Sequence, residues 1–385
     1  MAVDRRLARS LIAATGATAM LGVTIGLTMT LLSLVLEERG YGETEIGFSA
    51  AVQFLGIMVF SPFAPRIMRR MGLVRPIALS LVVCAICLAS FTLFTSYASW
   101  LVIRLIFGGA EALLFVASET WINEAVPARL RGRVVALYGT MLAIGFAAGP
   151  LIVKATGTAD AAPFVVGTIL VLAGLLPLAI GMGMAPTIDE APNKHVLAVF
   201  RALPVAAGSA ALFGLLDSGL FSLLAVYGLN IGLEKNDAVQ LVTALVSGGI
   251  VLQIPIGWLA DRVDRAHLLA GCAGLATVLL MILPATVGHG FAIHVVLFGI
   301  GGLLGAFWIL AMILLGQKYS GSDLATGNVG LTIAYGIGSV TGPALCGYAM
   351  ELWHPHGLVV PLVALTAAFT LFAATRGRTR ANEGA

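Results

Sequence analysis

The stretch GWLADRVDR, residues 257–265, places four charged side chains within five positions of an otherwise apolar chain. The four are Asp261, Arg262, Asp264 and Arg265. Only 11% of the 385 residues are charged, and apolar runs flank the stretch on both sides. This pattern predicts a short charged loop between two apolar helices.

Composition indicates the class of protein. Hydrophobic residues make up 59% of the chain and the mean hydropathy is +0.99, whereas a soluble surface needs roughly a quarter of charged residues. Runs of about 20 apolar residues, enough for a helix to cross ~30 Å of hydrocarbon, recur from end to end. We therefore expect an all-α integral membrane protein. Twelve spans are predicted, at 8–36, 45–65, 76–97, 99–122, 133–155, 163–184, 203–230, 238–260, 267–287, 290–316, 324–349 and 357–375.

Basic residues predict the orientation, because Lys and Arg are retained on the cytoplasmic side of a membrane. Eighteen of the 22 fall at the termini and in alternate loops. They are Arg5, Arg6, Arg9, Arg66, Arg69, Arg70, Arg75, Arg129, Arg131, Arg133, Lys194, Arg201, Arg262, Arg265, Lys318, Arg376, Arg378 and Arg380. Both termini are thus expected in the cytoplasm and the chain in the inner membrane. Since the basic residues are dispersed and the net charge is only +3, no nucleic-acid partner is expected.

Matching fragments indicate an internal repeat. Gly26 matches Gly219, 193 residues later. The motif GxxxGP of Gly145, Gly149 and Pro150 recurs, at the same offset of 193, as Gly338, Gly342 and Pro343. A repeat of half the chain predicts two six-helix bundles in parallel orientation, 1–186 and 203–385, joined by a cytoplasmic linker at 187–202.

Three motifs carry a resemblance to a known family. The opening stretch is similar to G-x-L-a-D-R-x-G-R, the loop signature of the major facilitator superfamily, with Asp264 in place of the usual glycine. RLIFGGAEA, from Arg104, resembles the family's R-x-x-x-G motif for proton coupling, and the GxxxGP of residues 145–150 resembles its antiporter motif. The resemblance covers essentially the whole chain and implies two pseudo-symmetric six-helix bundles, within a branch of bacterial drug or metabolite antiporters.

The charges of the opening stretch predict a cytoplasmic gate. The span that starts at 133 directs its positive N-terminal dipole, together with Arg131 and Arg133, toward the place where Asp261 emerges. Arg262 and Arg265 would complete this gate. The alternative is that the basic residues only anchor the helix at the membrane surface.

The matching loop of the first half differs, because SPFAPRIMRRMG carries Pro65 where the family has an acid. Asp323 stands at the start of the eleventh predicted span. There a carboxylate can accept free backbone N–H groups and meet Arg66 or Arg69. We therefore expect Asp323 and Arg66 to be the gate residues of that side.

Ionisable residues within predicted spans are expensive unless they are paired or face water. Arg104 and Glu111 lie seven residues apart on one helical stripe, and Asp217 lies near the middle of the seventh span. These three are the predicted proton-coupling residues, with Asp217 as the favoured carrier because its own helix offers no partner. A static Arg104–Glu111 pair is the alternative.

The resemblance implies a central cavity lined by the first, fourth, seventh and tenth spans. Thr24 and Thr28 could add hydroxyls to it, Trp308 an aromatic wall, and Glu119 and Asn123 could guard its inner mouth. Packing for Trp308, and capping or interface anchoring for Glu119 and Asn123, are the alternatives. Gly145, Gly149, Pro150, Gly338, Gly342 and Pro343 are predicted helix-packing positions, either for motion or for close packing alone.

These observations predict a secondary transporter that moves a small organic molecule by alternating access, with export by proton antiport as the first choice. A proton symporter or uniporter for uptake, and a non-transporting receptor or scaffold, are the alternatives. The sequence has no HExxH, G-x-S-x-G or Walker A segment. We therefore expect no enzyme, cofactor or metal, and a monomer whose partners are its substrate, protons and the lipid bilayer.

Overall fold

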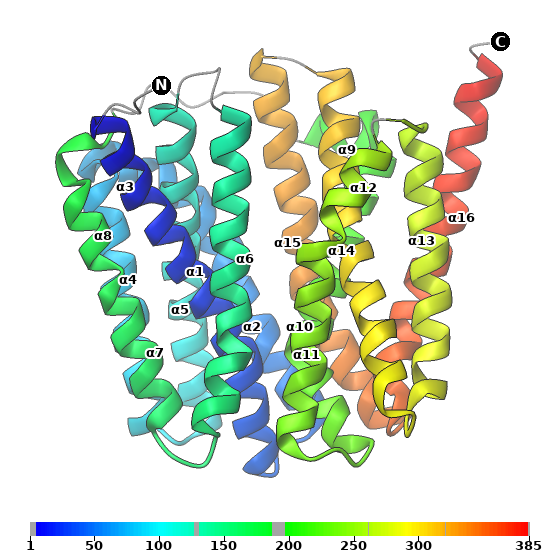
Figure 1. Ribbon diagram of the computed structural model, residues 1–385, viewed down its shortest axis with the longest axis horizontal. Helices are drawn as coiled ribbons and strands as arrows, with labels where there is room; N and C mark the ends of the chain where they lie inside the picture. The colour runs from blue at the N-terminus through cyan, green and yellow to red at the C-terminus, as the bar shows by residue number, and fades with distance from the viewer. Residues whose placement is uncertain (1–4, 127–130, 187–196, 261, 320, 384–385) are drawn as a thin grey trace. The chain divides into compact units, whose positions relative to one another are not determined.

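The computed structural model describes residues 5–126, 131–186, 197–260, 262–319 and 321–383. Every regular element in these ranges is a helix. Twelve helical segments among them are long and apolar enough to cross a membrane. The prediction of an all-α membrane protein with twelve spans is therefore confirmed (Figure 1).

The chain divides into two compact units. Unit 1 comprises Met1–Val35 and Val52–Ala191, and unit 2 comprises Leu36–Ala51 and Pro192–Ala385. The predicted first bundle includes residues 36–51, whereas the contacts of this segment group it with unit 2. The bundle limits of 1–186 and 203–385 remain predictions, as does the linker, of which residues 187–196 lie outside the described ranges.

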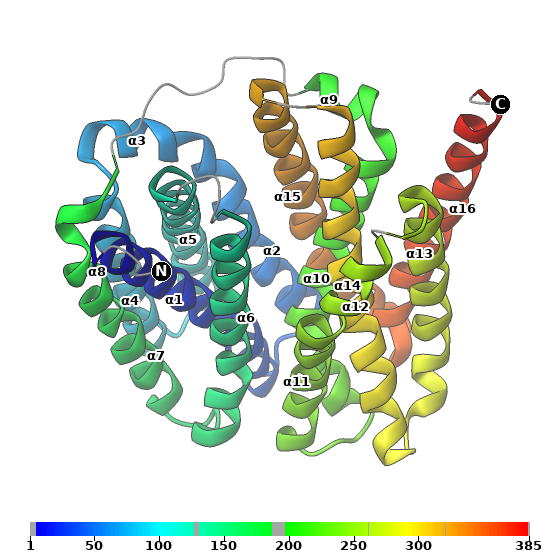
Figure 2. The same ribbon diagram turned by 45° about the horizontal axis from the view of Figure 1, so that its top comes forward.

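Unit 1 takes most of α1 (Arg5–Glu38) and the second half of α2 (Glu43–Phe60). It continues with η1 (Ser61–Phe63), α3 (Ala64–Met71), α4 (Val74–Leu93), α5 (Tyr97–Ala125), α6 (Arg131–Thr156), α7 (Ala162–Ala173), α8 (Leu175–Ile180) and η3 (Met182–Met184). Within this unit α4 packs against α5 and α7 (Figures 1 and 2).

Unit 2 begins its main part with α9 (Leu197–Ala202) and α10 (Pro204–Asn230). It continues with α11 (Lys235–Val251), α12 (Gln253–Ala260), α13 (Arg265–Ile282), η4 (Leu283–Thr286), α14 (Gly290–Lys318), α15 (Gly321–Leu352), η5 (His356–Leu358) and α16 (Val359–Glu383). The extensive contact of α10 with α15 and that of α13 with α16 organise this unit (Figure 2).

The first helix of each predicted half is followed by a glycine in the same conformation. Gly40 follows α1 with φ of 82°, and Gly232 follows α10 with φ of 88°. Only glycine adopts this left-handed conformation without steric cost, which makes it the usual residue after a helix. The repeat read from the sequence thus ends the first helix of each half in the same way.

Glycines allow the helices of each unit to approach closely. In unit 1, a Cβ added to Gly145 would lie 2.0 Å from the carbonyl oxygen of Ala19, and one on Gly149 would lie 2.1 Å from the carbonyl carbon of Gly26. Between lipid-embedded helices, where no water is expelled, such backbone proximity supplies much of the van der Waals attraction. The α1–α6 crossing therefore depends on these small residues.

The α10–α15 crossing of unit 2 repeats this arrangement. An added Cβ on Gly338 would lie 1.9 Å from the carbonyl oxygen of Ala211, and one on Gly342 would lie 2.4 Å from that of Leu215. Pro150 and Pro343 stand inside α6 and α15, each directly after the second glycine of its motif. The structure thus places the six predicted packing residues at equivalent crossings.

Candidate functional site

A buried hydrogen-bond chain joins three helices of unit 1. The amide nitrogen of Gln53 on α2 donates to Thr28 Oγ1 on α1, at 3.0 Å, and to Glu111 Oε2 on α5, at 2.9 Å. Gln53 and Thr28 have no exposed surface and Glu111 is 1% exposed. Both N–H groups of the amide are used, so Gln53 fixes the position of the Glu111 carboxyl group relative to α1.

Gly108 explains how α2 reaches the carboxyl group. An added Cβ on Gly108 would lie only 2.0 Å from the carbonyl oxygen of Gln53, and one on Gly56 would lie 2.4 Å from that of Leu105. The two helices therefore cross with their backbones in contact. The glycine of the R-x-x-x-G motif makes room for the neighbour that holds Glu111.

Arg104 is fully buried in the same unit. Its three guanidinium nitrogens, and Glu111 Oε1, have no hydrogen-bond partner among the residues that the structure describes. Arg104 and Glu111 therefore make no hydrogen bond to each other among the described residues, and the static pair stays an alternative. Buried polar atoms of this kind are costly and concentrate where function requires them.

Asp217 lies in the middle of α10, in unit 2. The hydroxyl of Tyr335 on α15 donates to its Oδ2 at 3.2 Å. Tyr335 belongs to a group of three rings with Phe213 on α10 and Trp308 on α14, which we call the aromatic cluster. The ring centroids lie 5.3 Å apart for Phe213 and Tyr335, 5.8 Å for Trp308 and Tyr335, and 6.0 Å for Phe213 and Trp308.

The other predicted cavity residues have varied surroundings. Thr24 and Thr28 are fully buried, and each hydroxyl donates to a carbonyl of its own helix, Thr24 to Leu21 and Thr28 to Thr24. Such bonds reduce what these hydroxyls can offer a ligand. Glu119 is exposed, and the side chain of Asn123 lies outside the described residues.

The predicted gate is described only in part. Asp261 lies outside the described ranges, as do the side chains of Arg131, Arg133 and Asp323. Arg66 is exposed on α3. The guanidinium carbon of Arg262 lies 3.6 Å from the ring centroid of Trp258, an attractive cation–π arrangement. The predicted gate therefore stays a prediction.

Asp264 has a structural role in the part of this loop that is described. Its Oδ1 accepts the backbone N–H of His267 at 2.9 Å and so caps the N-terminus of α13. This hydrogen bond holds the pKa of Asp264 below its usual range. Arg265 begins the helix that Asp264 caps. The departure from the family's glycine at 264 thus supplies a helix cap.

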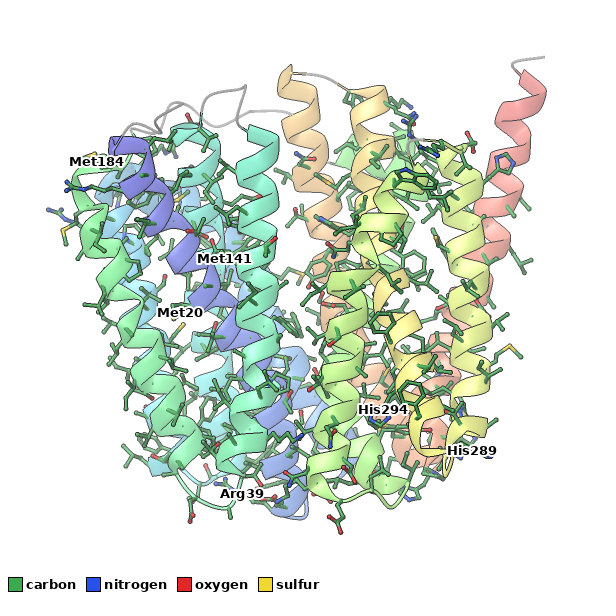
Figure 3. The ribbon with its side chains drawn as sticks, in the orientation of Figure 1. Met20, Arg39, Met141, Met184, His289 and His294 are labelled. Carbon is green, nitrogen blue, oxygen red and sulfur yellow. The ribbon has the colours of Figure 1, made fainter. Side chains whose placement is uncertain are left out.

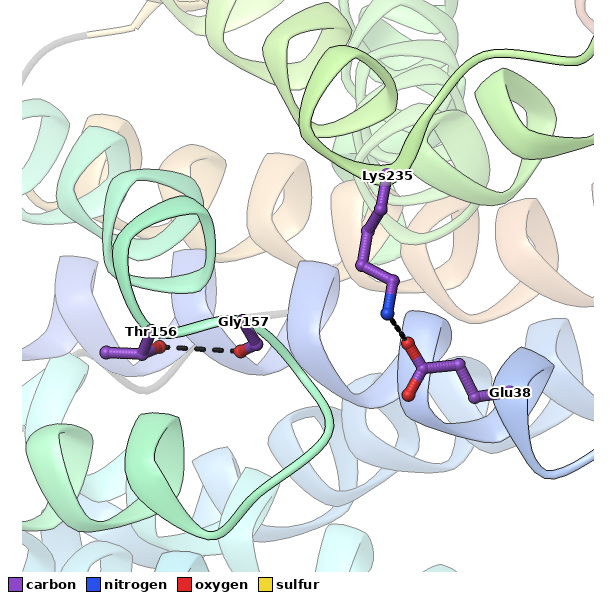
Figure 4. Close-up of polar contacts among 4 residues, drawn as sticks. All are labelled: Glu38, Thr156, Gly157 and Lys235. Carbon is purple, nitrogen blue, oxygen red and sulfur yellow. Dashed lines mark hydrogen bonds and ion pairs between the residues drawn. The ribbon is translucent and has the colours of Figure 1, made fainter.

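A polar group in unit 2, which we call the corner cluster, gathers where α1 ends and α2 begins. Lys235 pairs with Glu38 (Figure 4). Asn230 Nδ2 donates to Glu43 Oε1 at 2.8 Å, and His354 Nδ1 lies 3.8 Å from the same oxygen. Arg39, His289 and His294 lie at this same end of unit 2, away from the C-terminus (Figure 3). His294 Nδ1 is 3.0 Å from the carbonyl oxygen of Gly290.

Sequence reasoning missed Gln53, Phe213, Tyr335, Glu43 and His354. Gln53 carried a signal, because it is a polar residue within an apolar run. The others gave none, since aromatic residues and helix-end charges are common in membrane helices. No group of three or more metal-ligating side chains that could hold an ion occurs among the described residues.

Comparison with known proteins shows what the chain is similar to. The family model of the Major Facilitator Superfamily matches residues 14–245 and 206–385. The uncharacterized MFS-type transporter YfkF of Bacillus subtilis is 24% identical over 343 residues, which cover 88% of each chain. The uncharacterized MFS-type transporter YcaD of Escherichia fergusonii is 25% identical over 368 residues, 94% of each chain.

Solved structures show the same fold. The nucleoside transporter NupG superposes with a TM-score of 0.79 at 12% identity, covering 95% of this chain and 99% of that one. A bacterial homolog of the human lysosomal transporter Spinster, inward-facing and occupied, gives a TM-score of 0.76 at 15% identity, covering 97% and 98%. At such identities the likeness concerns the fold alone.

Proposed function

The chain belongs to the major facilitator superfamily, and from this premise we propose that it exports a small organic molecule across the inner membrane in exchange for protons. Membership makes it a multi-pass membrane protein of a transporter family. The proposal adds the direction, the proton coupling and the placement of both termini in the cytoplasm. It also assigns a monomer as the working unit.

One observation carries the coupling. Each unit holds a carboxyl group near the middle of a helix whose recorded hydrogen bond comes from a neutral donor, Gln53 for Glu111 and Tyr335 for Asp217. A charged carboxylate in such surroundings is expensive, whereas a neutral carboxyl group keeps its hydrogen bond at little cost. Protonation therefore lowers the free energy of each unit when its carboxyl group is shielded from water.

This property suits alternating access. When a carboxyl group faces water it can release its proton, and before it is shielded again it needs either a proton or another means of neutralisation. Suppose that the transporter changes from inward-open to outward-open only with its substrate bound, and changes back only with a proton bound. It then exchanges substrate for protons. Glu111 and Asp217 are the proposed proton sites, and buried Arg104 would favour charged Glu111 through its field.

The test uses purified protein in proteoliposomes with an acidic interior and an internal pH indicator. Compounds come first from a ligand-stabilisation screen, since a ligand that binds the folded state raises its melting temperature. We expect a hit compound to accumulate inside the vesicles while the internal pH rises. The variant with both Glu111→Gln and Asp217→Asn should reconstitute into liposomes as well as the wild-type protein, but its vesicles should not accumulate the compound.

Other outcomes separate the alternatives. Accumulation that requires an alkaline interior would indicate symport and contradict the antiport proposal. Equilibration of the compound without any pH response would indicate a uniporter. Binding without flux in the wild-type protein would leave a receptor or scaffold.

A further inference from the structure

We propose that Asp217 and the aromatic cluster of Phe213, Trp308 and Tyr335 form a binding site for an organic cation, of the quaternary ammonium or phosphonium class. The inference deepens the proposed function, because it names the chemistry of the transported molecule. Binding can nevertheless be measured without transport, so the two proposals can fail separately.

The four side chains form one surface. Phe213 and Asp217 are four residues apart on α10 and so lie on the same helical face. Trp308 and Tyr335 reach this face from α14 and α15, with all three centroid separations between 5.3 and 6.0 Å. The Tyr335 hydroxyl, 3.2 Å from Asp217 Oδ2, ties the carboxyl group to the rings.

This surface is partly accessible, whereas the adjoining runs of α10 and α14 are buried. Phe213, Asp217, Trp308 and Tyr335 are each partly exposed. By contrast, α10 is continuously buried from Ser218 to Gly228, and α14 from Ile300 to Phe307. The four side chains of the site are therefore less buried than these adjoining runs.

The charge of Asp217 is not balanced by the helices that carry the site. The sequences of α10, α14 and α15 contain one Lys or Arg in total, Lys318 at the end of α14. Lys318 donates instead to the carbonyl oxygen of Ala202, at 2.8 Å. When Asp217 is ionised, the site therefore carries a net negative charge that a cation can neutralise.

The rings favour the same kind of ligand. Aromatic faces carry partial negative charge and attract cations within about 6 Å of their centroids, most strongly when the cation is weakly hydrated. Quaternary ammonium and phosphonium ions have low hydration and apolar substituents that the rings can contact. An anion would be repelled by both Asp217 and the ring faces, and a neutral molecule would gain from the rings alone.

The experiment compares three aryl probes, of which the two ions have nearly the same tetrahedral shape, in equilibrium binding to the purified full-length protein, without any gradient. They are the cation tetraphenylphosphonium, the neutral triphenylphosphine oxide and the anion tetraphenylborate. We expect saturable binding of the cation. We expect at least tenfold weaker binding of the other two. Asp217→Asn should weaken cation binding on the order of 100-fold, and Trp308→Leu by about tenfold.

Matched variants control for folding. Trp308→Phe and Asp217→Glu retain an aromatic face and a charge, so each should stay within about threefold of wild type. Trp353→Leu, which removes an exposed tryptophan outside the aromatic cluster, should change nothing. Equal binding of all three probes, or wild-type affinity in both Asp217→Asn and Trp308→Leu, would overturn the inference.

The outcome also separates this inference from the proposed function. Cation binding without proton-driven accumulation would overturn the antiport proposal and keep the binding site. Proton-driven accumulation of a neutral compound, with no cation binding, would overturn the binding site and keep the antiport proposal.

Discussion

Gly47 of α2 and Gly347 of α15 lie backbone to backbone, so that a Cβ added to either one would be 3.2 Å from the Cα of the other. The same Cβ on Gly47 would lie 2.1 Å from the carbonyl oxygen of Pro343, and that on Gly347 would lie 2.2 Å from that of Glu43. Backbone atoms cannot move aside as a flexible side chain can. This contact is one of those that join residues 36–51 to unit 2.

Gly347→Ala should consequently destabilise the protein. The new methyl group has no space, and overpacking of this kind costs about 1–3 kcal/mol. Thermal unfolding in detergent measures the effect. Gly271→Ala is the matched control, because Gly271 lies in helix α13 with nothing within 4 Å of its Cβ position, so that alanine there should be neutral or stabilising by about 0.5–1 kcal/mol. Equal melting temperatures of the two variants would refute the close contact.

The corner cluster should show energetic coupling between Glu43 and Asn230. Their hydrogen bond of 2.8 Å joins the start of α2 to the end of α10, and a bond to a charged acceptor contributes about 1.5–3 kcal/mol. A double-mutant cycle with Glu43→Ala and Asn230→Ala measures it. The exposed pair of Asp237 and Gln240 within α11, at 2.9 Å, is the control and should couple by no more than about 0.5 kcal/mol. Coupling that is equally small in both cycles would contradict this prediction.

The sequence predicted the parts of the fold that depend on local composition. Twelve apolar runs became twelve candidate spans, and the GxxxGP motifs at residues 145 and 338 occupy equivalent helix crossings. Both signals are contiguous along the chain, because a membrane helix satisfies its own backbone and needs only length and apolar side chains.

The contacts of the candidate site could be predicted less well. Glu111 and Asp217 were visible as charges in apolar runs, but their donors Gln53 and Tyr335 come from distant helices. Which side chains meet depends on where helices cross, and those crossings are set by backbone contacts such as that of Gly108 with Gln53. A single sequence does not specify such pairs. Glu111, for example, accepts its hydrogen bond from Gln53 of α2 and not from Arg104 of its own helix.

The cap of α13 leads to a prediction with a defined pH dependence. Asp264→Ala removes the acceptor of the His267 N–H and should cost about 0.5–2 kcal/mol at neutral pH, whereas Asp264→Asn should retain most of the stability. Because the pKa of Asp264 is lowered in the folded protein, the contribution of its charge is present above the unfolded value of about 3.9 and is lost as the pH falls through the folded value. Melting temperatures at several pH values measure this. An Asn variant as unstable as the Ala variant would show that the cap is not responsible.

The hydrogen-bond chain of Gln53 in unit 1 predicts that a second substitution can restore part of the stability lost by the first. Gln53→Met leaves Glu111 Oε2 and Thr28 Oγ1 without their buried donor, which should cost about 1–3 kcal/mol. Replacing both partners by apolar residues, as in Gln53→Met with Glu111→Met, should recover part of this loss, because no buried acceptor then remains at position 111. Thermal unfolding of the single and double variants gives the comparison. A double variant less stable than the sum of the two single changes would contradict the proposed pairing.

The two carboxyl groups should differ in what their neutralisation removes. Asp217→Asn takes away both the proposed proton site and the negative charge that faces the aromatic cluster, so it should abolish proton-driven accumulation and weaken cation binding on the order of 100-fold. Glu111→Gln changes a group in the other unit that is held by Gln53, and its amide oxygen can still accept that hydrogen bond. Cation binding should therefore stay within about threefold of wild type, while accumulation driven by a pH gradient falls.

Exchange of labelled for unlabelled tetraphenylphosphonium at equal pH in proteoliposomes isolates this difference, because exchange needs binding and conformational change but no net proton movement. Glu111→Gln should exchange the cation at a rate similar to wild type and fail only when a pH gradient must do work. Asp217→Asn should fail in both assays. If Glu111→Gln accumulates the cation as fully as wild type at the same protein level, Glu111 takes no part in coupling and Asp217 alone must carry the proton. That single carboxylate would then alternate between proton and cation, since a site of one charge can be neutralised by only one of them at a time.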